Sequence, residues 1–502
     1  MELKNNHIKK APCIAVFGTG SEVGKSIVAT ALCRFFANRG VCVAPFKAQN
    51  MSNNSGVTPE GLEMGRAQIV QAEAAGIPPH VDMNPILLKP ASEIGSQVVL
   101  LGNAVFNSTA SDYQKRKENL FSKACDALDR LRRKYRLIIM EGAGSCAEIN
   151  LMQTDIVNFR MAEYAGADVI LVADIHKGGV FGQIVGTLEC ISKTQQDLIK
   201  GFIINRFRGD KNLFKDGVRW IEEKTGKKVF GVLPWYTDFN IEAEDSVVIE
   251  KCGKVSSKKT NAPSIAVIRI PHISNFTDFD PIAGLKDLDL YFIEKAENLF
   301  PFSAVIIPGS KNTRFDLDWL NKAGWSEKLI KYAGQGGHIL GICGGYQMMG
   351  RLVHDPEGLE GKPGTTRGLS LLPVETILNA PKTTTLTRFS VNGIKGAGYE
   401  IHMGRTKRLG GRPMFYVQQR NNIIDEDEDG CVALNNRIMG SYIHGLFDTP
   451  AIAKYWLDSI GLGSIQVHQA HGPAARDKAY DLLSAHFEKH VDTEEILEMS
   501  AI

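Results

Sequence analysis

The most constraining feature of this sequence is a glycine-rich loop between an apolar run and a helical pattern. Residues 13–17 are apolar, the segment FGTGSEVGKS follows, and a helical pattern begins at Lys25. In this context, backbone N–H groups and the helix N-terminus bind phosphate, a lysine reaches the terminal phosphates and a hydroxyl ligates Mg2+. The sequence therefore predicts a nucleotide-binding loop formed by Thr19, Gly20, Ser21, Glu22, Val23, Gly24, Lys25 and Ser26, with Ser26 also a metal ligand.

The spacing of this loop departs from the common phosphate-binding pattern. Gly18 and Gly24 enclose five residues, whereas the common pattern has four between its glycines. The alternative is an ordinary glycine-rich turn that precedes a chance GKS. Because the GKS stands at a strand–helix junction, we expect nucleotide binding.

Three polar residues farther along the chain fit the same site. Glu141 ends an apolar run, where an acid completes the Mg2+ shell in proteins with such loops. Lys47, in PFKAQNMSNNS, follows the second apolar run and is expected to stabilise a transferring phosphoryl group. Glu63 is a further candidate metal ligand. The alternatives are a turn-capping acid for Glu141 and an exposed helix acid for Glu63.

The first half of the chain alternates apolar runs with helical patterns. The expected strands are 13–17, 41–46, 137–140, 169–173, 201–204 and 229–233, and the clearest expected helices are 25–38 and 62–75. This alternation favours an α/β fold with a parallel sheet covered on both faces.

The chain is too long for one hydrophobic core, since its 502 residues exceed the usual size of a domain. A polar segment at 249–263 ends in proline and is interpreted as a linker. We therefore expect a nucleotide-binding domain at 1–248, a second α/β domain at 264–450 and a helical segment at 451–502. The second set of strands is expected at 264–270, 290–293, 304–307, 338–342, 414–418 and 437–443, and the clearest late helical pieces are 453–460 and 479–486.

A second chemical motif lies in that second domain. The segment HILGICGGYQ has the order strand, G-x-C-G-G, helix, which is the form of a nucleophile elbow with Cys343 as the nucleophile. The following helix N-terminus favours a thiolate. The N–H of Gly344 is placed to stabilise an oxyanion, and Gly309, which follows an earlier strand, is a second candidate donor.

A thiol nucleophile needs a base. His444 in GSYIHGLFD stands at a strand end, where a strand leads to an active-site edge. His402 in GYEIHMG is its rival. We prefer His444 and keep His402 as the alternative.

The composition excludes several classes of protein. The net charge of +2, from 58 basic and 56 acidic residues, is too balanced to indicate a nucleic-acid or membrane surface. The N-terminal residues lack the apolar core of a signal peptide, and no apolar run is long enough to span a membrane. The nine cysteines form no CxxC pair, which favours reduced thiols and a cytoplasmic protein.

Eight segments, in order, resemble the cobyric acid synthase family, the glutamine-hydrolysing amidotransferases of cobalamin biosynthesis. They are FGTGSEVGKS, PFKAQNMSNNS, MEGAGSCAEINL, NRFRGD, PGSKNT, GICGGYQMMG, GYEIHMGRT and SYIHGLFD. The front half is also similar to dethiobiotin synthetase, whose loop has the same longer spacing. The rear half resembles a class I, triad-type glutamine amidotransferase domain.

Two positions depart from what the resemblance implies. The wider amidotransferase class has a glutamate two residues after the catalytic histidine, where this chain has Leu446. The resemblance thus supports a Cys343–His444 pair and leaves the third group open, with Glu400 or a backbone carbonyl as options. In the segment DIHKGG, His176 and Lys177 stand where DIDRGG is expected.

The resemblance implies four amidations of adenosylcobyrinate a,c-diamide, at its b, d, e and g carboxylates, with glutamine as the nitrogen source and ATP and Mg2+ as cofactors. Because ammonia is mostly ammonium at neutral pH and is then not nucleophilic, we expect a sheltered path for it between the two domains. The alternatives are a sibling amidotransferase, such as cobyrinate a,c-diamide synthase or a cell-wall lipid amidating system, and, in a different class, a ParA/MinD-like ATPase switch.

Overall fold

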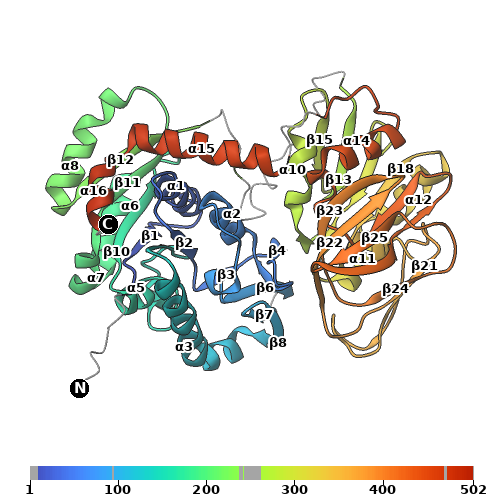
Figure 1. Cartoon of the computed structure of the whole chain (residues 1–502), viewed down its shortest axis with the longest axis horizontal. Helices are drawn as coiled ribbons and strands as arrows, with labels where there is room; N and C mark the ends of the chain where they lie inside the picture. The colour runs from blue at the N-terminus through green and yellow to red at the C-terminus, as the bar shows by residue number, and fades with distance from the viewer. Residues whose placement is uncertain (1–9, 93–94, 237–240, 242–261, 468–471, 501–502) are drawn as a thin grey trace.

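The computed structural model describes residues 10–92, 95–236, 241, 262–467 and 472–500. Two α/β domains lie side by side, and each is built around its own six-stranded sheet (Figure 1). Within the described part of the chain, no helix is long and apolar enough to cross a membrane. The expected cytoplasmic location stays a prediction.

The front domain contains a fully parallel sheet in the order β12-β11-β10-β1-β9-β2. Its strands are β1 (Cys13–Gly18), β2 (Val43–Phe46), β9 (Leu137–Glu141), β10 (Asp168–Asp174), β11 (Ile199–Phe207) and β12 (Lys228–Pro234). All six strands predicted in this half of the chain are present, most of them longer than predicted by one or more residues. Parallel strands are buried on both faces, so they form continuous apolar runs that sequence reasoning finds easily.

Helices cover both faces of this sheet. On β1, Ala15 and Phe17 face one apolar core, and Ile14 and Val16 face the other. This alternation follows from the two-residue period of a strand. The helices of the front domain are α1 (Lys25–Asn38), α2 (Arg66–Ala74), α3 (Ala110–Lys134), α4 (Ile149–Met152), α5 (Phe159–Ala165), α6 (Val180–Cys190), α7 (Lys193–Leu198) and α8 (Lys215–Thr225), with short 3-10 helices η1 (Val81–Met83) and η2 (Lys211–Phe214).

Between β2 and β9 the chain forms small strands that the sequence analysis did not predict. They are β3 (Gln49–Met51), β4 (Ser55–Val57), β5 (Glu63–Gly65), β6 (Ile86–Ser92), β7 (Gly95–Leu100) and β8 (Asn103–Thr109). The helix predicted at 62–75 is therefore wrong at its start. Glu63–Gly65 pairs with Ser55–Val57 as a strand, and α2 begins only at Arg66.

The second domain contains a sheet in the order β15-β13-β16-β18-β28-β27, parallel except for β27. Its strands are β13 (Ser264–Ile268), β15 (Asp289–Ile293), β16 (Ala304–Ile307), β18 (His338–Ile342), β27 (Cys431–Ala433) and β28 (Ile438–Ser441). Beside them lie η4 (Phe276–Phe279), α10 (Asp280–Ala283), α11 (Thr313–Lys322), α12 (Trp325–Gly334), α13 (Gly344–Met348) and η5 (Leu446–Asp448). The predicted two-domain α/β fold class is confirmed.

Residues 352–429 form two four-stranded sheets beside the main sheet. One contains β19 (Leu352–Asp355), β20 (Gly364–Arg367), β21 (Val374–Ile377) and β24 (Arg405–Arg408). The other contains β22 (Thr383–Val391), β23 (Ile394–His402), β25 (Phe415–Arg420) and β26 (Ile423–Asp429). A two-stranded pair, β14 (Ile273–Ser274) with β17 (Gly309–Ser310), lies at the edge that carries the site.

The last helices divide between the two domains. In α14 (Pro450–Ser459), Trp456 and Leu457 join the core of the second domain. In α15 (Pro473–His490), Leu483 and Phe487 join the core of the front domain. The final helix α16 (Thr493–Ser500) also packs on the front domain (Figure 1). The chain thus returns from the second domain to cover α1. The predicted linker at 249–263 falls almost wholly outside the described residues.

Candidate active sites

The predicted phosphate loop connects β1 to α1. Gly24 has a φ of 100°, and a Cβ there would lie 2.1 Å from Nδ2 of Asn205. The same Asn205 amide donates to the carbonyl of Val23 at 2.9 Å, so it fixes the loop from β11. Only glycine fits both the conformation and the contact at position 24.

Lys25 extends from the start of α1 back over this loop. Its Nζ donates to the carbonyl of Gly20 at 2.9 Å and to that of Gly144 at 2.8 Å. Gly144 belongs to the loop after β9, so Lys25 joins the ends of two neighbouring strands. Among the described residues, the N-cap residue of α1, Gly24, makes no side-chain capping hydrogen bond. The N–H groups at a helix start, beside a lysine, are suited to bind phosphate.

Glu141 is the centre of a buried polar cluster at the end of β9. Its Oε1 accepts from Oγ of Ser26 at 2.9 Å and from Nζ of Lys47 at 2.8 Å. Its Oε2 accepts from the side-chain amides of Gln71 and Gln68 on α2. The structure thus brings together Ser26, Lys47 and Glu141, which the sequence analysis placed in one site.

The donor set at Glu141 fits Mg2+. The ion takes oxygen ligands and usually combines one or two protein oxygens with substrate phosphates and water. The Ser26 hydroxyl and the Glu141 carboxylate supply such a pair next to the phosphate loop. Among the described residues, no group of three or more His, Cys, Asp or Glu side chains forms a metal site of protein ligands alone.

Glu63, the third predicted metal ligand, is not part of this cluster. Its Oε1 accepts from Nζ of Lys89 at 2.7 Å and from Oγ of Ser55 at 2.8 Å. Its Oε2 accepts from Nζ of Lys382, a residue of the second domain, at 2.6 Å. Although burial acts to raise the pKa of Glu63, the two lysines outweigh it and hold that pKa well below its ordinary range. Glu63 therefore forms an ion pair across the domains, and we propose that it is not part of the predicted magnesium site.

The segment DIHKGG lies at the end of β10. Asp174 accepts from the backbone N–H of His176 at 2.7 Å and from Arg206 at 2.9 Å. The His176 ring lies 5.0 Å from the ring of Trp235, and Lys177 is exposed, 3.9 Å from Glu22 of the phosphate loop. The two departing residues thus border the nucleotide site.

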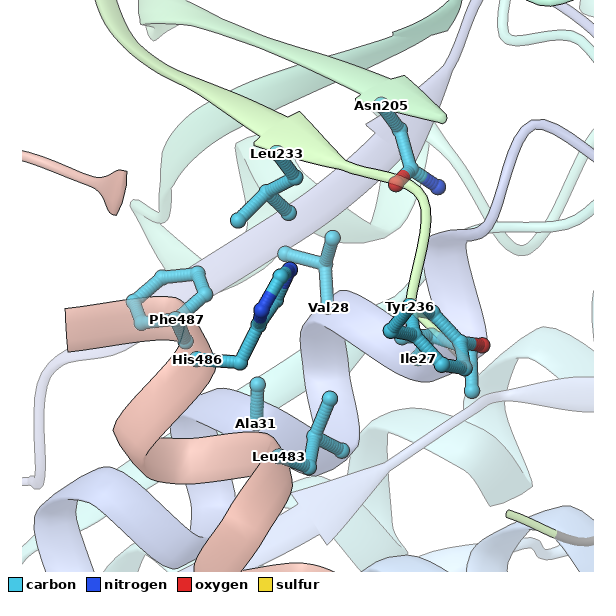
Figure 2. Close-up of a pocket in the computed structure, with 9 residues that line it drawn as sticks. All are labelled: Ile27, Val28, Ala31, Asn205, Leu233, Tyr236, Leu483, His486 and Phe487. Carbon is cyan, nitrogen blue, oxygen red and sulfur yellow. The ribbon is translucent and has the colours of Figure 1, made fainter. Parts of the chain in front are cut away.

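A small, mainly apolar pocket lies beside the helix that begins at Lys25. Figure 2 shows Ile27, Asn205, Tyr236, Leu483 and His486 among the residues around it. Leu483 and His486 come from α15, so this late helix contributes one wall of the pocket.

Cys343 stands between β18 and α13 in a strained turn. Its φ and ψ are 51° and −109°, a conformation that side chains rarely adopt. Its Sγ contacts the carbonyl of Ile401 at 3.5 Å. A Cβ on Gly345 would lie 2.0 Å from the carbonyl oxygen of Ile307, so the turn packs directly on β16. These features are those of a nucleophile elbow.

Gly344 and Gly309 both lie against the cysteine–histidine pair. A Cβ on Gly344 would be 2.8 Å from the backbone nitrogen of Ser310. A Cβ on Gly309 would be 3.1 Å from Cε1 of His444. The structure therefore brings together the four residues Cys343, His444, Gly309 and Gly344.

His444 is fixed by an acid that the sequence analysis did not find. Nδ1 of His444 lies 2.6 Å from Oδ2 of Asp278, and the N–H of Gly445 donates to Oδ1 of Asp278 at 2.9 Å. The His444 side chain is buried and also interacts with Cys343. Burial acts to lower the pKa of His444, but the charges of Asp278 and Cys343 outweigh it and raise that pKa to about 10.

Neither option for the third group matches this arrangement. Glu400 accepts from Arg420 at 2.9 Å and from Thr387 at 2.7 Å, and it lies 3.4 Å from Nε2 of His402. His402 stacks on Tyr442 with ring centroids 3.7 Å apart. The orienting partner of His444 is a side-chain carboxylate, that of Asp278. The only sequence signal for it is a polar stretch, SNFTDFD, soon after a strand.

Both domains match known protein families. Residues 14–248 match the CobQ/CobB/MinD/ParA nucleotide binding domain, and residues 264–452 match the CobB/CobQ-like glutamine amidotransferase domain. The chain is 49% identical over 496 residues to a cobyric acid synthase of Chlorobium phaeobacteroides, covering 97% of this chain and 98% of that one. It is 44% identical over 480 residues to the cobyric acid synthase of Bacteroides fragilis, covering 95% of both. The chain is therefore an amide-forming enzyme with a nucleotide-binding and a glutamine amidotransferase domain, and it belongs to the cobyric acid synthase family.

Proposed function

We propose that this enzyme uses glutamine and ATP to amidate the b, d, e and g carboxylates of adenosylcobyrinate a,c-diamide, which gives adenosylcobyrate. The observation that carries the proposal is that one chain holds two complete polar clusters. One joins Ser26, Lys47 and Glu141 beside the phosphate loop, and the other joins Cys343 and His444 to Asp278.

In the second domain, the Cys343 thiolate attacks the side-chain amide carbon of glutamine. His444 donates a proton to the departing nitrogen, so ammonia leaves and a glutamyl thioester remains. Water, deprotonated by His444, then hydrolyses the thioester to glutamate. Asp278 holds the imidazole in orientation and favours its charged form. N–H groups of Gly344 and Gly309 stabilise the oxyanion in both steps.

In the front domain, a carboxylate of the acceptor attacks the γ-phosphate of ATP, so ADP leaves and an acyl phosphate forms. Lys25 and Lys47 balance the negative charge that spreads over the phosphoryl oxygens. When bound at Ser26 and Glu141, Mg2+ supplies further positive charge at the phosphates. Ammonia then displaces phosphate from the acyl phosphate, which forms the amide.

The two reactions share ammonia, which at neutral pH is mostly ammonium in water and then not nucleophilic. The buried contacts between the domains favour transfer without release to solvent. One of these contacts is the buried ion pair between Glu63 of the front domain and Lys382 of the second domain.

The acceptor distinguishes this proposal from its nearest alternative, cobyrinate a,c-diamide synthase. The test offers purified enzyme with ATP, Mg2+ and glutamine either cobyrinate or its adenosylated a,c-diamide. We expect turnover of the diamide alone, with four successive amidations followed by mass spectrometry. Preference for unamidated cobyrinate would assign the chain to the sibling activity. Nucleotide turnover without glutamine hydrolysis would favour an ATPase switch.

A further inference from the structure

One short segment of the second domain contacts three parts of the molecule. Residues 273–274 form β14, which pairs with Gly309–Ser310. Four residues beyond β14, Asp278 holds His444. Between them, Asn275 and Thr277 contact the front domain. We call residues 273–278 the acid turn, because it carries the acid that orients the histidine.

Two side-chain hydrogen bonds connect the acid turn to the front domain. The backbone N–H of Ser55 donates to Oδ1 of Asn275 at 2.9 Å, and Oγ1 of Thr277 donates to Oδ1 of Asn54 at 3.2 Å. All four residues are buried, so water competes little for these bonds. Asn275 lies three residues before Asp278 and Thr277 one residue before it, so the front domain holds the turn at two points.

The acid turn has an uncommon backbone conformation at Asn275. Asn275 has a φ of 51°, in the left-handed region that non-glycine residues rarely adopt. Its carbonyl accepts from the backbone N–H of Asp278 at 3.0 Å, which closes the turn. The side chain of Asn275 is thus held by the front domain, while its backbone carbonyl positions Asp278 of the second domain.

Asn54 and Ser55, which bind the acid turn, belong to an ordered part of the front domain. Ser55 begins β4, and its Oγ joins Lys89 and Glu63 in a buried network. Asn54 and Ser55 also end the polar segment that starts at Lys47, whose Nζ contacts Glu141. One continuous segment therefore contacts the nucleotide cluster at one end and the acid turn at the other.

We propose that Asn54 and Ser55, with Asn275 and Thr277, are positioning residues of the glutaminase reaction. The front domain holds the acid turn, and the acid turn sets the orientation of His444 through Asp278. This inference rests on the proposed glutaminase chemistry of Cys343. Its consequence is that the rate of ammonia release depends on the conformation of residues 47–55, which also serve carboxylate activation.

The test uses the full-length enzyme and a pair of substitutions at Thr277. Thr277→Val removes the hydroxyl at nearly constant shape, and Thr277→Ser retains it. For Thr277→Val we expect kcat for glutamine hydrolysis to fall roughly three- to tenfold, with the KM for glutamine unchanged. Its pH profile should also shift, because the hold of Asp278 on His444 is weakened. Thr277→Ser should restore the wild-type rate and profile.

A second substitution tests the other bond. Asn275→Gly removes the side-chain amide yet tolerates the left-handed backbone. It should lower kcat in the same way. The matched control is Thr187→Val, because the Thr187 hydroxyl is bonded to the carbonyl of Gln183 within α6, away from the acid turn. This control should keep the wild-type glutaminase rate.

The outcomes separate this inference from the proposed function. If Thr277→Val and Asn275→Gly hydrolyse glutamine with the wild-type kcat and pH profile, the inference is wrong and the proposed function stands. If Thr277→Val and Thr277→Ser are equally slow with an unchanged pH profile, the turn has a structural role alone and the inference is also wrong. If the wild-type enzyme hydrolyses no glutamine, the proposed function itself fails.

Discussion

The carboxylate of Asp278 lies 2.6 Å from Nδ1 of His444, although 166 residues separate the two in the chain. Both are buried, and the same carboxylate also accepts from the N–H of the following residue, Gly445. This relationship supplies the orienting acid that the glutamate two residues after the histidine provides in the wider amidotransferase class, where this chain has Leu446.

Replacing this acid should disable the glutaminase without disturbing the front site. For Asp278→Asn, we expect kcat/KM for glutamine hydrolysis to fall on the order of a hundredfold or more, since His444 loses both orientation and charge stabilisation. Amidation driven by added ammonium should continue. The matched control is Asp280→Asn, two residues along and outside the His444 contact. Equal activity of the Asp278 and Asp280 variants would contradict the role of Asp278.

The charge on His444 should be visible in the pH dependence of stability. Its pKa is raised from the ordinary 6.5 to about 10 in the folded protein. Because the folded-state pKa is the higher one, the stabilisation from this proton is full below about pH 6.5 and is lost as the pH rises through about 10. The free energy of unfolding of the wild type should therefore exceed that of His444→Gln most at low pH. The measurement is chemical unfolding of both proteins across this range. A difference that stays constant with pH would show that His444 is neutral in the fold.

The magnesium site should depend on Glu141 and not on Glu63. For Glu141→Gln, we expect the Mg2+ concentration that gives half-maximal ammonium-driven amidation to rise on the order of tenfold or more. Removing Mg2+ with a chelator should stop amidation by the wild type. For Glu63→Gln, the Mg2+ dependence should match the wild type, because Lys89 and Lys382 already bind that carboxylate. An equal shift in both variants would return Glu63 to the metal site.

Helix α15 should stabilise the front domain by packing against α1. Phe487 on α15 is fully buried beside Phe35 of α1, so Phe487→Ala should cost about 3–5 kcal/mol of front-domain stability. Trp456→Ala on α14 is the matched control, because Trp456 packs in the second domain. Thermal unfolding with and without ATP would distinguish them. Loss of the ATP-induced stabilisation in the Trp456 variant alone would contradict the assignment of α15 to the front domain.

The features that the sequence predicts well are local. Buried parallel strands form apolar runs, and glycine motifs at strand ends mark the phosphate loop and the nucleophile elbow. The sequence therefore predicts all six strands of the front sheet, five of the six strands of the second main sheet, and the elements that carry Lys25 and Cys343. It also predicts that Ser26, Lys47 and Glu141 share one edge, because the carboxyl ends of parallel strands meet there.

The features that escape prediction depend on tertiary contacts. Nothing near Asp278 in the chain indicates that its partner is His444. The helical pattern at 479–486 predicts a helix but not which domain covers it. The position of Glu63 likewise depends on Lys382, more than 300 residues away. Of the small strands at 49–109 and 352–429, the sequence predicts only the one at 414–418. Others, such as β8 and β26, have mixed burial and lack the apolar runs of the main sheets.

The most direct test of the account follows nitrogen from glutamine to the corrin. Purified enzyme is supplied with adenosylcobyrinate a,c-diamide, ATP, Mg2+ and glutamine labelled with 15N at its side-chain amide, in the presence of unlabelled ammonium. We predict a product with four new amides that all carry the label, and no labelled product from Cys343→Ser. A product with unlabelled amides, or an unchanged corrin while ATP and glutamine are consumed, would contradict the account.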